Sequence, residues 1–377
     1  MINCTVTKSV DTLIRMSTLN EEYLRNLLSH INDPHAGTDI VSLGWLRGVG
    51  MDGARVSVDL RAAYPIDGIR ESLVRSIVAA LESDAHVESA SVNLDWRVVP
   101  HTVQGELKPQ AQIKNIIAVA SGKGGVGKST TAVNLALALR ADGACVGILD
   151  ADIYGPSMPR MLGISGHPET DGTRIIPQFA HGLQVMSIGF LVEEETPMIW
   201  RGPMVTSALQ QLLTETKWKG LDYLVIDLPP GTGDIQLTLA QKVPVSGTII
   251  VTTPQDIALL DARKAVHMFR KVDVTVLGIV ENMSTHTCSN CGHEESIFGS
   301  GGGQRMSEQY AVPLLGKLPL AMQIRNDLDE GRPTVVSDPN SELTARYREM
   351  ARNTAAQLSK RPRNLDLNLP QINILNS

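Results

Sequence analysis

A glycine-rich loop constrains this chain more than any other feature. Residues 121–130 read SGKGGVGKST, and residues 122–129 fit the pattern G-x-x-x-x-G-K-[ST]. An apolar run at residues 116–120 precedes the loop, and a helical pattern at residues 131–140 follows it. The order strand, glycine-rich loop, helix is the setting in which this pattern binds phosphate. The sequence therefore predicts a phosphate-binding loop, or P-loop, inside an α/β domain.

The residue types in the loop suit a nucleotide. Glycines let the backbone turn so that successive N–H groups point at an anion, and the helix that follows adds the positive end of its dipole. Lys128 offers a charge to the β- and γ-phosphates, and Ser129 offers a hydroxyl to Mg²⁺. The predicted nucleotide-binding residues of the loop are Gly122, Lys123, Gly124, Gly125, Val126, Gly127, Lys128, Ser129 and Thr130.

Beyond residue 114, short apolar runs alternate with helical patterns. The runs predict strands at residues 116–120, 146–149, 183–188, 223–226, 248–251, 274–280 and 314–318. The helical patterns cover residues 129–141, 204–216, 235–242, 257–271, 303–310 and 341–359. Nearly continuous apolar strands separated by helices indicate a mainly parallel, doubly wound sheet with both faces covered. Ligands of such sheets bind beyond the carboxyl ends of the strands.

Acidic residues follow two of these strands. Asp227 closes the run at residues 223–226, where an aspartate can hold Mg²⁺. Asp150 closes the run at residues 146–149 and would lie beside the Mg²⁺ shell. Asp152 lies two residues further on, where it could orient or deprotonate the attacking water. The sequence therefore predicts Ser129, Asp150 and Asp227 as magnesium ligands, and Lys128 and Asp152 as catalytic residues.

The chain divides into regions of different character. Residues 17–99 show the pattern of a small α+β domain, with helices expected at 19–31 and 69–81 and strands at 40–44, 55–60 and 87–94. Residues 100–113 are polar and contain prolines, as a linker does. The predicted second domain covers residues 114–360, and residues 361–377 form the predicted flexible tail.

Composition excludes several classes of protein. A net charge of −6 over 377 residues argues against a general nucleic-acid binder. No run of about 18 apolar residues predicts a membrane-spanning helix. The N-terminus carries Asp11 and no long apolar core, so it does not resemble a secretory signal, and Met16 is as good a candidate start as Met1. Four cysteines do not make a disulfide framework, so we expect a reducing cytoplasm.

Cys288 and Cys291 form a C-x-x-C pair in a polar loop that follows the run at residues 274–280. A redox dithiol should open a helix in a thioredoxin-like unit, which this loop does not resemble. A zinc site needs two further ligands, and His286 and His293 are strained candidates at such close spacing. Two copies of the pair in a dimer would supply four thiolates, the ligand set of a 4Fe–4S cluster and of structural zinc.

Lys123 makes the loop similar to one class of P-loop proteins. A lysine directly after the first glycine is not needed by a standard phosphate cradle. The sequence here resembles the deviant P-loop class, which includes the nitrogenase iron protein and the MinD, ParA and Mrp groups. The resemblance implies a homodimer in which Lys123 reaches the nucleotide of the other subunit. Such a cation would neutralise charge that develops during phosphoryl transfer, so Lys123 joins the predicted catalytic residues.

From about residue 115 to residue 358 the chain resembles the Mrp/ApbC-type iron–sulfur cluster carriers, which are P-loop ATPases. The segments that carry the resemblance are SGKGGVGKST, LDADIYGPSMP, WRGPM, VIDLPPGTGD, VTTPQDIALLDARKA, ENMS, CSNCGHEESIFGSGGG and LGKLPLAMQIRNDLDEGRP. The resemblance implies binding and hydrolysis of ATP with Mg²⁺, a homodimer, and a labile 4Fe–4S cluster on Cys288 and Cys291. It implies transfer of that cluster to apo iron–sulfur proteins, exchange with upstream scaffolds, and contact between Asn282 and the base.

Residues 17–99 resemble the small domain of SufT-like iron–sulfur assembly proteins. The segments DIVSLGWLRGV, DGARVSVDL and YPIDGIRESLVRSIVAAL carry this resemblance. That family often has a cysteine in the loop before the second helix, where this chain has Tyr64-Pro65-Ile66. The difference favours a scaffold or docking role over a metal-binding one.

Three other functions compete with a cluster carrier. A MinD/ParA-like spatial regulator would act on membrane or DNA, but the segment after the basic residues 360–363, residues 364–370, is proline-bounded and acidic rather than a basic amphipathic helix. The net charge also opposes DNA binding. A nitrogenase-like electron donor would hold a permanent cluster through cysteines at separate positions. A zinc-stabilised ATPase dimer would use the same thiolates. We therefore expect neither a membrane nor a nucleic-acid partner.

Overall fold

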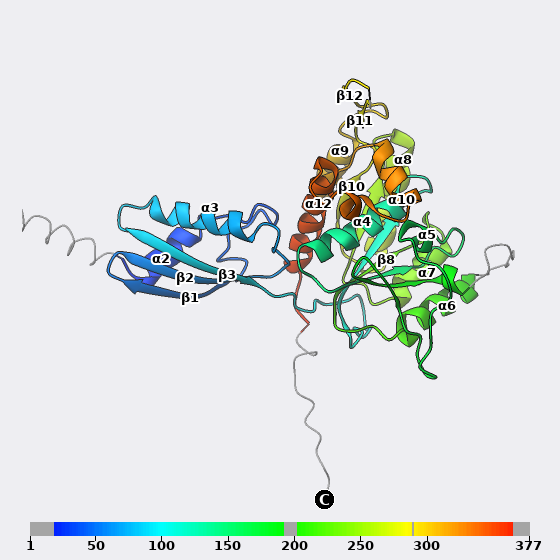
Figure 1. Ribbon diagram of the computed structural model, residues 1–377, viewed down its shortest axis with the longest axis horizontal. Coiled ribbons are helices and arrows are strands. Elements are labelled where there is room, and N and C mark those ends of the chain that lie inside the picture. Colours follow the sequence, from blue (N-terminus) through cyan, green and yellow to red (C-terminus); the bar gives the residue numbers. More distant parts are fainter. Residues whose placement is uncertain (1–18, 192–201, 289, 365–377) are drawn as a thin grey trace, which may run out of the picture. The chain divides into compact units, whose positions relative to one another are not determined.

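The computed structural model describes residues 19–191, 202–288 and 290–364. The chain divides into two compact units, Met1–Val98 and Val99–Ser377, each of which is described by itself (Figure 1). The candidate starts Met1 and Met16 lie outside the described residues, as does most of the predicted tail, residues 365–377. Within the described part of the chain, no helix is long and apolar enough to cross a membrane.

The first unit contains one small mixed sheet. Strands β1 (Leu46–Asp52), β2 (Arg55–Ala62) and β3 (Ser89–Trp96) lie in that order, with β1 antiparallel and β3 parallel to β2. Exposed and buried residues alternate along β2, which indicates a sheet with one covered face. From residue 19 onward its helices are α2 (Glu21–Leu28) and α3 (Arg70–Glu82), and α3 packs on β3. Both predicted helices and the strands at 55–60 and 87–94 are confirmed.

The strand predicted at residues 40–44 is wrong. This segment forms consecutive turns, in which Leu43 N–H donates to the Asp39 carbonyl at 3.0 Å and Gly44 N–H to the Val41 carbonyl at 2.9 Å. The Asp39 carboxylate accepts the N–H groups of Val41 and Ser42, at 3.1 and 2.8 Å. A short acidic side chain thus gives the backbone local partners in place of a strand ladder.

The second unit is built on an eight-stranded sheet of order β13-β10-β9-β4-β8-β5-β7-β6. Its strands are β4 (Ile113–Ser121), β5 (Val146–Asp150), β6 (Gln178–Ala180), β7 (Leu183–Ser187), β8 (Leu221–Asp227), β9 (Gly247–Thr252), β10 (Val276–Glu281) and β13 (Leu314–Lys317). Only β6, at one edge, pairs antiparallel. Every residue of β8 is buried, as expected of a central strand with both faces covered. The predicted mainly parallel, doubly wound sheet is confirmed.

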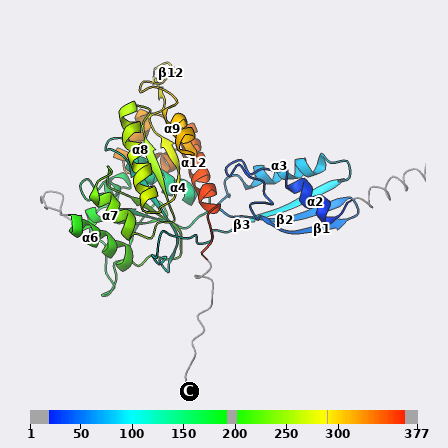
Figure 2. The same ribbon diagram turned by 180° about the vertical axis from the view of Figure 1, so that it is seen from behind.

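Helices cover both faces of this sheet. They are α4 (Lys128–Ala141), α5 (Met158–Met161), α6 (Gly202–Glu215), α7 (Asp234–Lys242), α8 (Asp256–Lys271), α9 (Gly302–Tyr310), α10 (Met322–Asp329), α11 (Thr334–Ser337) and α12 (Glu342–Ser359). Helices α4 and α12 pack on each other over one face, seen in Figure 1. Helices α6 to α9 contact one another in turn over the other face, seen in Figure 2. Helix α4 is buried nearly all round, because α12 covers the side that the sheet does not.

A buried ion-pair group joins these two helices. Asp142, directly after α4, is 2% exposed at its side chain and accepts from Arg352 Nε at 2.7 Å and Nη2 at 2.9 Å. Arg348 Nη2 lies 2.7 Å from the same carboxylate. The two-pronged contact with Arg352 fixes the guanidinium in one orientation. The end of α4 is therefore held on the middle of α12.

The first residues of the predicted linker, residues 100–113, make contacts within the second unit. His101 is buried and forms an isolated bridge with Arg363, and the Asn364 N–H donates to the Pro100 carbonyl at 2.9 Å. Gln104 is also buried, and its side-chain amide bonds the backbone of three residues after or within α7, namely Ala240, Val243 and Val245. Residues 100–104 are therefore packed on the second unit, and residues 361–364, at the start of the predicted tail, lie beside them.

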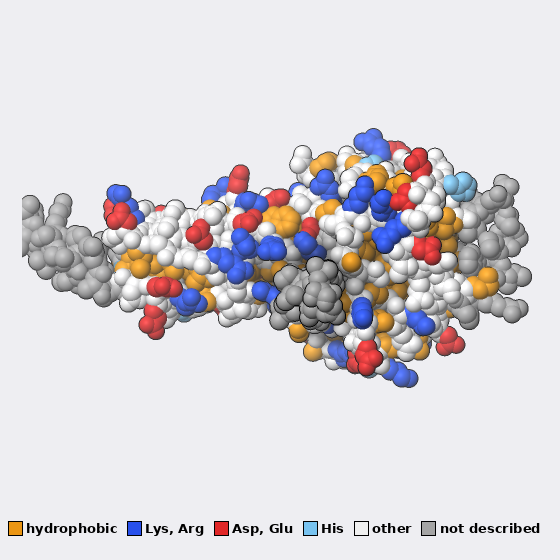
Figure 3. Space-filling model, turned by 90° about the horizontal axis from the view of Figure 1, so that it is seen from below, with side chains coloured by type: hydrophobic (Ala, Val, Ile, Leu, Met, Phe, Trp, Pro, Cys, Tyr) orange, Lys and Arg blue, Asp and Glu red, His pale blue; other side chains and the backbone are white. Residues whose placement is uncertain are grey.

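The surface carries charges of both signs. Figure 3 shows Lys and Arg side chains beside Asp and Glu side chains on both units. Several large apolar side chains are also exposed, among them Tyr154, Ile257 and Ile297. This mixture is ordinary for a globular protein, whose surface always retains apolar groups.

Candidate nucleotide site and cysteine loop

The glycine-rich loop lies at the carboxyl end of β4 and leads directly into α4. Gly125 and Gly127 have φ values of 78° and 79°, a left-handed conformation that glycine adopts without steric cost. A Cβ atom at Gly127 would overlap the side-chain amide of Asn282. At Gly122 it would overlap the backbone of α8 around Asp261. Glycine is therefore required at these positions both for the turn and for the close approach of neighbouring segments.

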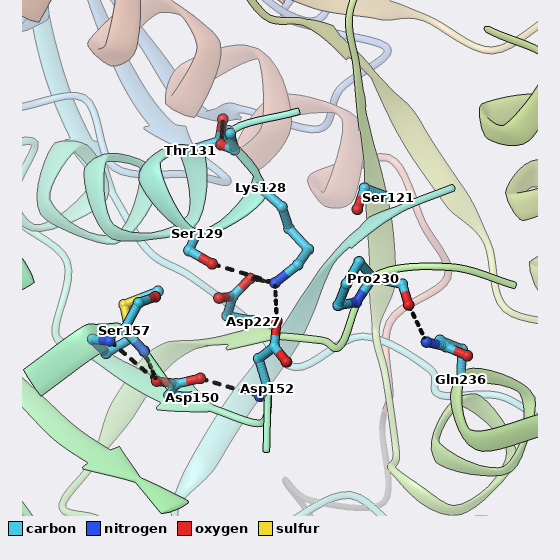
Figure 4. A network of polar contacts seen from close by, with 12 residues as sticks. Ser121, Lys128, Ser129, Thr131, Asp150, Asp152, Ser157, Asp227, Pro230 and Gln236 are labelled. Atoms are coloured by element: carbon cyan, nitrogen blue, oxygen red, sulfur yellow. Dashed lines mark hydrogen bonds and ion pairs between the residues drawn. The ribbon is translucent and has the colours of Figure 1, made fainter. Parts of the chain in front are cut away.

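Lys128 is the first residue of α4, and its ammonium lies among three polar groups (Figure 4). Its Nζ is 2.5 Å from Asp227 Oδ1, 3.5 Å from Asp152 Oδ2 and 3.4 Å from Ser129 Oγ. Lys128 is 6% exposed and Asp227 is fully buried. The structure thus brings together four residues that the sequence singled out separately, because β4, β5 and β8 are neighbours that end at one edge of the sheet.

Asp150 lies opposite Asp227 in the register of β5 and β8. Its Oδ1 accepts the Asp152 N–H at 3.1 Å. Its Oδ2 accepts from the Ser157 N–H at 3.0 Å, from the Met158 N–H at 3.1 Å and from the Ser187 hydroxyl at 3.1 Å. Burial, together with the charge of Asp227, raises the pKa of Asp150 to about 7. Both oxygens are engaged with the protein, so Asp150 fixes the shape of the loop that carries Asp152.

Asp227 and Asp152 each keep one buried carboxylate oxygen without a partner among the described residues, and the oxygen of Asp227 fits a magnesium ion. Burial raises the pKa of Asp227, although the charge of Lys128 opposes that rise, and burial also raises the pKa of Asp152. Asp227 Oδ2 and Asp152 Oδ1 are buried and have no hydrogen-bond partner in the part of the chain that the structure describes. A buried polar atom without a partner costs about 1–3 kcal/mol. Carboxylate oxygens are ligands that Mg²⁺ prefers, so the residues present suit this ion.

A cavity of about 550 Å³ opens beside the P-loop. Gly127 and Thr130 line it on the loop side, and most of the remaining wall is apolar, with Met161, Met283, Leu320, Ile324 and Leu328. Asn282 is also in the wall, where its Nδ2 donates to the Val126 carbonyl at 2.9 Å. Pockets of this size accommodate small organic ligands. The cavity is therefore a candidate site for the nucleoside part of a nucleotide.

Lys123 lies apart from this group. It is half-buried, and its carbonyl accepts the Ser121 hydroxyl at 2.9 Å. Its ammonium forms no ion pair with any residue that the structure describes. The structure therefore separates the two lysines of the loop, with Lys128 inside the acidic group and Lys123 outside it.

Sequence reasoning missed several residues that shape the site. Ser157 and Ser187 hold Asp150, and Gln236 closes the loop after β8 by accepting the Gly233 N–H at 3.0 Å and donating to the Pro230 carbonyl (Figure 4). The wall from α10 was also missed, although its segment carried the family resemblance. The prolines and glycines before Gln236 predict a turn, but nothing in the sequence predicts that the Gln236 side chain bonds the backbone of that turn.

The cysteine pair lies in a small hairpin at one end of the second unit (Figure 1). Strands β11 (His286–Thr287) and β12 (Glu294–Glu295) pair antiparallel. Cys288 N–H donates to the His293 carbonyl and Gly292 N–H to the Cys288 carbonyl, both at 2.9 Å. Backbone N–H groups at Cys291 and Asn290 lower the pKa of Cys288, so they favour its thiolate. Cys288 is half-buried and Cys291 is exposed, which leaves both thiols accessible.

The histidines near this pair do not complete a site with it. The described residues of one chain contain no group of three or more His, Cys, Asp and Glu side chains placed to hold a metal ion. The His286 ring instead lies beside Glu295, with Nδ1 3.9 Å from Oε1, and His293 is exposed. The single-chain zinc site considered from the sequence is therefore not assembled.

Comparisons with known proteins agree with this geometry. Residues 112–355 match the family described as NUBPL iron-transfer P-loop NTPase, and residues 21–94 match the iron–sulfur cluster assembly protein family. An iron–sulfur cluster carrier protein from Haemophilus influenzae is 49% identical over 345 residues, which make up 90% of this chain and 92% of that protein. One from Escherichia coli K12 is 64% identical over 272 residues, or 70% of this chain and 73% of that protein.

A solved structure is also similar. A nucleotide-binding protein from Archaeoglobus fulgidus, in complex with ADP, superposes with a TM-score of 0.55 at 36% identity and covers 62% of this chain and 91% of that chain. Membership of a P-loop NTPase family implies nucleotide binding and hydrolysis. The chain therefore belongs to the family of NUBPL-type iron-transfer P-loop NTPases, which includes the iron–sulfur cluster carrier proteins, and carries an iron–sulfur cluster assembly domain at residues 21–94.

Proposed function

We propose that this chain hydrolyses ATP and carries a labile 4Fe–4S cluster between two copies of itself. Cys288 and Cys291 of each copy would supply the four thiolates that such a cluster takes. The observation that most supports this is the accessible hairpin, which presents two thiols per chain, half of that ligand set. The homodimer would release the cluster to apo iron–sulfur proteins and receive it from upstream scaffolds. The proposed location is the cytoplasm, which keeps such thiols reduced.

The residues around Lys128 suit phosphoryl transfer. When ATP binds, the Lys128 ammonium would exchange the carboxylates of Asp152 and Asp227 for oxygens of the β- and γ-phosphates. Asp152, whose pKa burial raises, would then orient or deprotonate the attacking water. Mg²⁺, held by Ser129 and Asp227, would neutralise phosphate charge. Asp150 would keep the loop of Asp152 in place through its four hydrogen bonds from the protein.

Two further assignments follow from the positions of Lys123 and Asn282. Lys123 stands outside the acidic group, where it could serve the nucleotide of the second copy and neutralise charge in the transition state. Asn282 uses its Nδ2 to bind the P-loop, so its Oδ1 is the atom that can accept the amino group of adenine in the neighbouring cavity.

Anaerobic reconstitution with iron and sulfide tests the proposal. The wild-type protein should bind about four irons per dimer, and the double variant Cys288→Ala/Cys291→Ala should bind none. Cys145→Ala is the matched control, because Cys145 is an exposed thiol elsewhere in the same unit and its loss should leave iron binding unchanged. Equal iron in the double variant, or a wild-type protein that retains only zinc, would contradict the carrier function and favour the zinc-stabilised dimer.

A further inference from the structure

Two consecutive residues at the end of β10 connect different parts of the second unit. Asn282 donates from Nδ2 to the Val126 carbonyl in the P-loop, at 2.9 Å. Glu281 accepts the Gly303 N–H at its Oε2, at 2.5 Å, at the start of α9. Glu281 is 1% exposed and Asn282 is 5% exposed. One strand end therefore bonds the nucleotide loop through one residue and the first turn of α9 through the next.

The Glu281 carboxylate takes the role that the side chain of an N-cap residue usually has, because it accepts an N–H group of the first turn of α9. Gly301, the N-cap residue of α9, has no side chain to accept the first N–H groups. A carboxylate at this end also interacts favourably with the positive end of the helix dipole. A Cβ at Gly303 would lie 3.0 Å from Glu281 Oε2, and one at Gly302 would lie 2.9 Å from the Pro254 carbonyl. The start of α9 therefore packs closely against the end of β10 and against the segment that follows β9.

The cysteine hairpin connects the end of β10 to the start of α9. On the β10 side, Ser284 N–H donates to the Leu318 carbonyl at 2.9 Å, and Leu320 N–H donates to the Thr285 carbonyl at 2.7 Å. Leu320 also lines the cavity beside the P-loop. On the other side, residues 290–301 lead from the hairpin into α9. The β10 end of the cysteine loop is thus anchored beside the wall of the nucleotide site, and its other end continues into α9, whose first turn Glu281 holds.

We propose that Glu281 is a positioning residue that transmits the nucleotide state of the P-loop to the cysteine hairpin. A change in the loop at Val126 would move Asn282 and the end of β10, and Glu281 would carry that movement to α9. The hairpin, held between β10 and α9, would then change the exposure of Cys288 and Cys291. The inference rests on the proposed function for the role of these thiols, and it adds a route by which ATP controls them.

Thiol accessibility tests the proposal without a loaded cluster. The full-length protein is reduced under anaerobic conditions and alkylated with iodoacetamide, alone or with Mg²⁺ and a non-hydrolysable ATP analogue. Mass spectrometry gives separate rates for Cys288 and Cys291, calorimetry gives the affinity for the analogue, and size-exclusion chromatography gives the oligomeric state. In the wild-type protein the analogue should change at least one rate by about fivefold or more, the lower end of ordinary coupling between sites.

Three variants distinguish a residue that transmits the nucleotide state from one that only caps the helix. Glu281→Ala should keep analogue affinity and oligomeric state but lose the effect of the analogue on the alkylation rates. Glu281→Gln keeps an oxygen acceptor for Gly303 and should retain part of the effect, and it carries the test if the alanine variant does not fold. Glu308 is an exposed glutamate on α9, and the control variant Glu308→Gln should behave as the wild type does. A purely structural cap would lower stability and leave the nucleotide effect in place.

The outcomes separate this inference from the proposed function. If the wild-type protein binds the analogue but its alkylation rates stay the same, the inference fails and nucleotide binding stands. If both Glu281 variants keep the full effect, Glu281 does not transmit it. If they lose the dimer instead, Glu281 serves assembly, which also overturns the inference. A wild-type protein that does not bind the analogue contradicts the proposed function and the inference together.

Discussion

Two lysines five residues apart in the P-loop occupy different environments. Lys128 is buried among carboxylates, with Asp227 as its closest partner at 2.5 Å, whereas Lys123 is half-buried and lies outside that group. A buried cation in a P-loop is the charge that holds phosphate in the ground state. A cation outside the acidic group is suited to a charge that develops later, in the transition state.

This difference leads to a kinetic prediction for Lys123. Lys123→Ala should keep the affinity for ATP and lower the turnover number by about 10²-fold, because the lost charge acts only in the transition state. Calorimetry with a non-hydrolysable analogue and phosphate-release kinetics measure the two quantities.

Lys128→Ala is the matched control for that experiment. It should lose nucleotide affinity itself, because Lys128 lies at the centre of the site. If Lys123→Ala also abolished binding, Lys123 would be an ordinary phosphate ligand of its own subunit.

The motif residues could be predicted from the sequence, because phosphate and magnesium chemistry restricts both residue type and spacing. Lys128, Ser129, Asp152 and Asp227 were found in this way, and the structure places them together. The hydrogen bonds of Ser157 and Ser187 to Asp150 were not predictable. Their spacing to Asp150 depends on how a loop and an adjacent strand fold back, which no local pattern records.

At the scale of elements, Asp142 joins α4 to α12 through Arg348 and Arg352. Removing one partner of a buried pair leaves the other charges uncompensated. Asp142→Ala should therefore lower the free energy of unfolding of the second unit by about 3 kcal/mol, as measured by urea denaturation.

A control for that prediction lies on α12, the helix that carries Arg348 and Arg352. Glu342→Gln removes an exposed ion pair with Arg346, whose atoms are 2.6 Å apart. It should change the free energy of unfolding by less than about 1 kcal/mol, because exposed pairs are screened by water. Equal effects of the two substitutions would contradict the role given to Asp142.

The packed segment at residues 100–104 makes a pH-dependent contribution. Burial lowers the pKa of His101, and the charges of Arg361 and Arg363 act in the same direction, while a bond to Asn115 opposes them. Below about pH 6.5, the ordinary value for histidine, the unfolded chain takes up a proton that the folded chain does not. Stability from this residue is therefore full above that pH and falls as the pH decreases.

Denaturation midpoints between pH 8 and pH 5.5 measure this effect. His101→Gln should show a shallower loss of stability on acidification than the wild-type protein. His267→Gln, at an exposed histidine of the same unit, should follow the wild-type curve. If His101→Gln followed it as well, His101 would be protonated equally in both states.

Element prediction succeeded where burial is repetitive. The apolar runs that became β4, β5, β8 and β9 are covered on both faces, so nearly every residue carries the signal. The strand expected at residues 40–44 failed because Asp39 supplies local hydrogen bonds. At the start of the predicted linker, Gln104 and His101 are polar yet buried, which composition does not reveal.

At the scale of the whole molecule, the proposed homodimer would give a single role to the two thiols of each chain and another to Lys123 of each P-loop. A two-fold axis brings each surface against its own copy. It would therefore double the pair Cys288 and Cys291 into four ligands and bring the Lys123 residues towards opposite nucleotides. The central claim is that the cluster belongs to the dimer and not to either chain.

Native mass spectrometry of the anaerobically reconstituted protein tests this claim most directly. The account predicts one main species, with the mass of two chains and one 4Fe–4S cluster, and a Cys288→Ala/Cys291→Ala protein that lacks the mass of the cluster. A single chain that carries a complete cluster would contradict the claim, as would a dimer whose added mass is that of zinc.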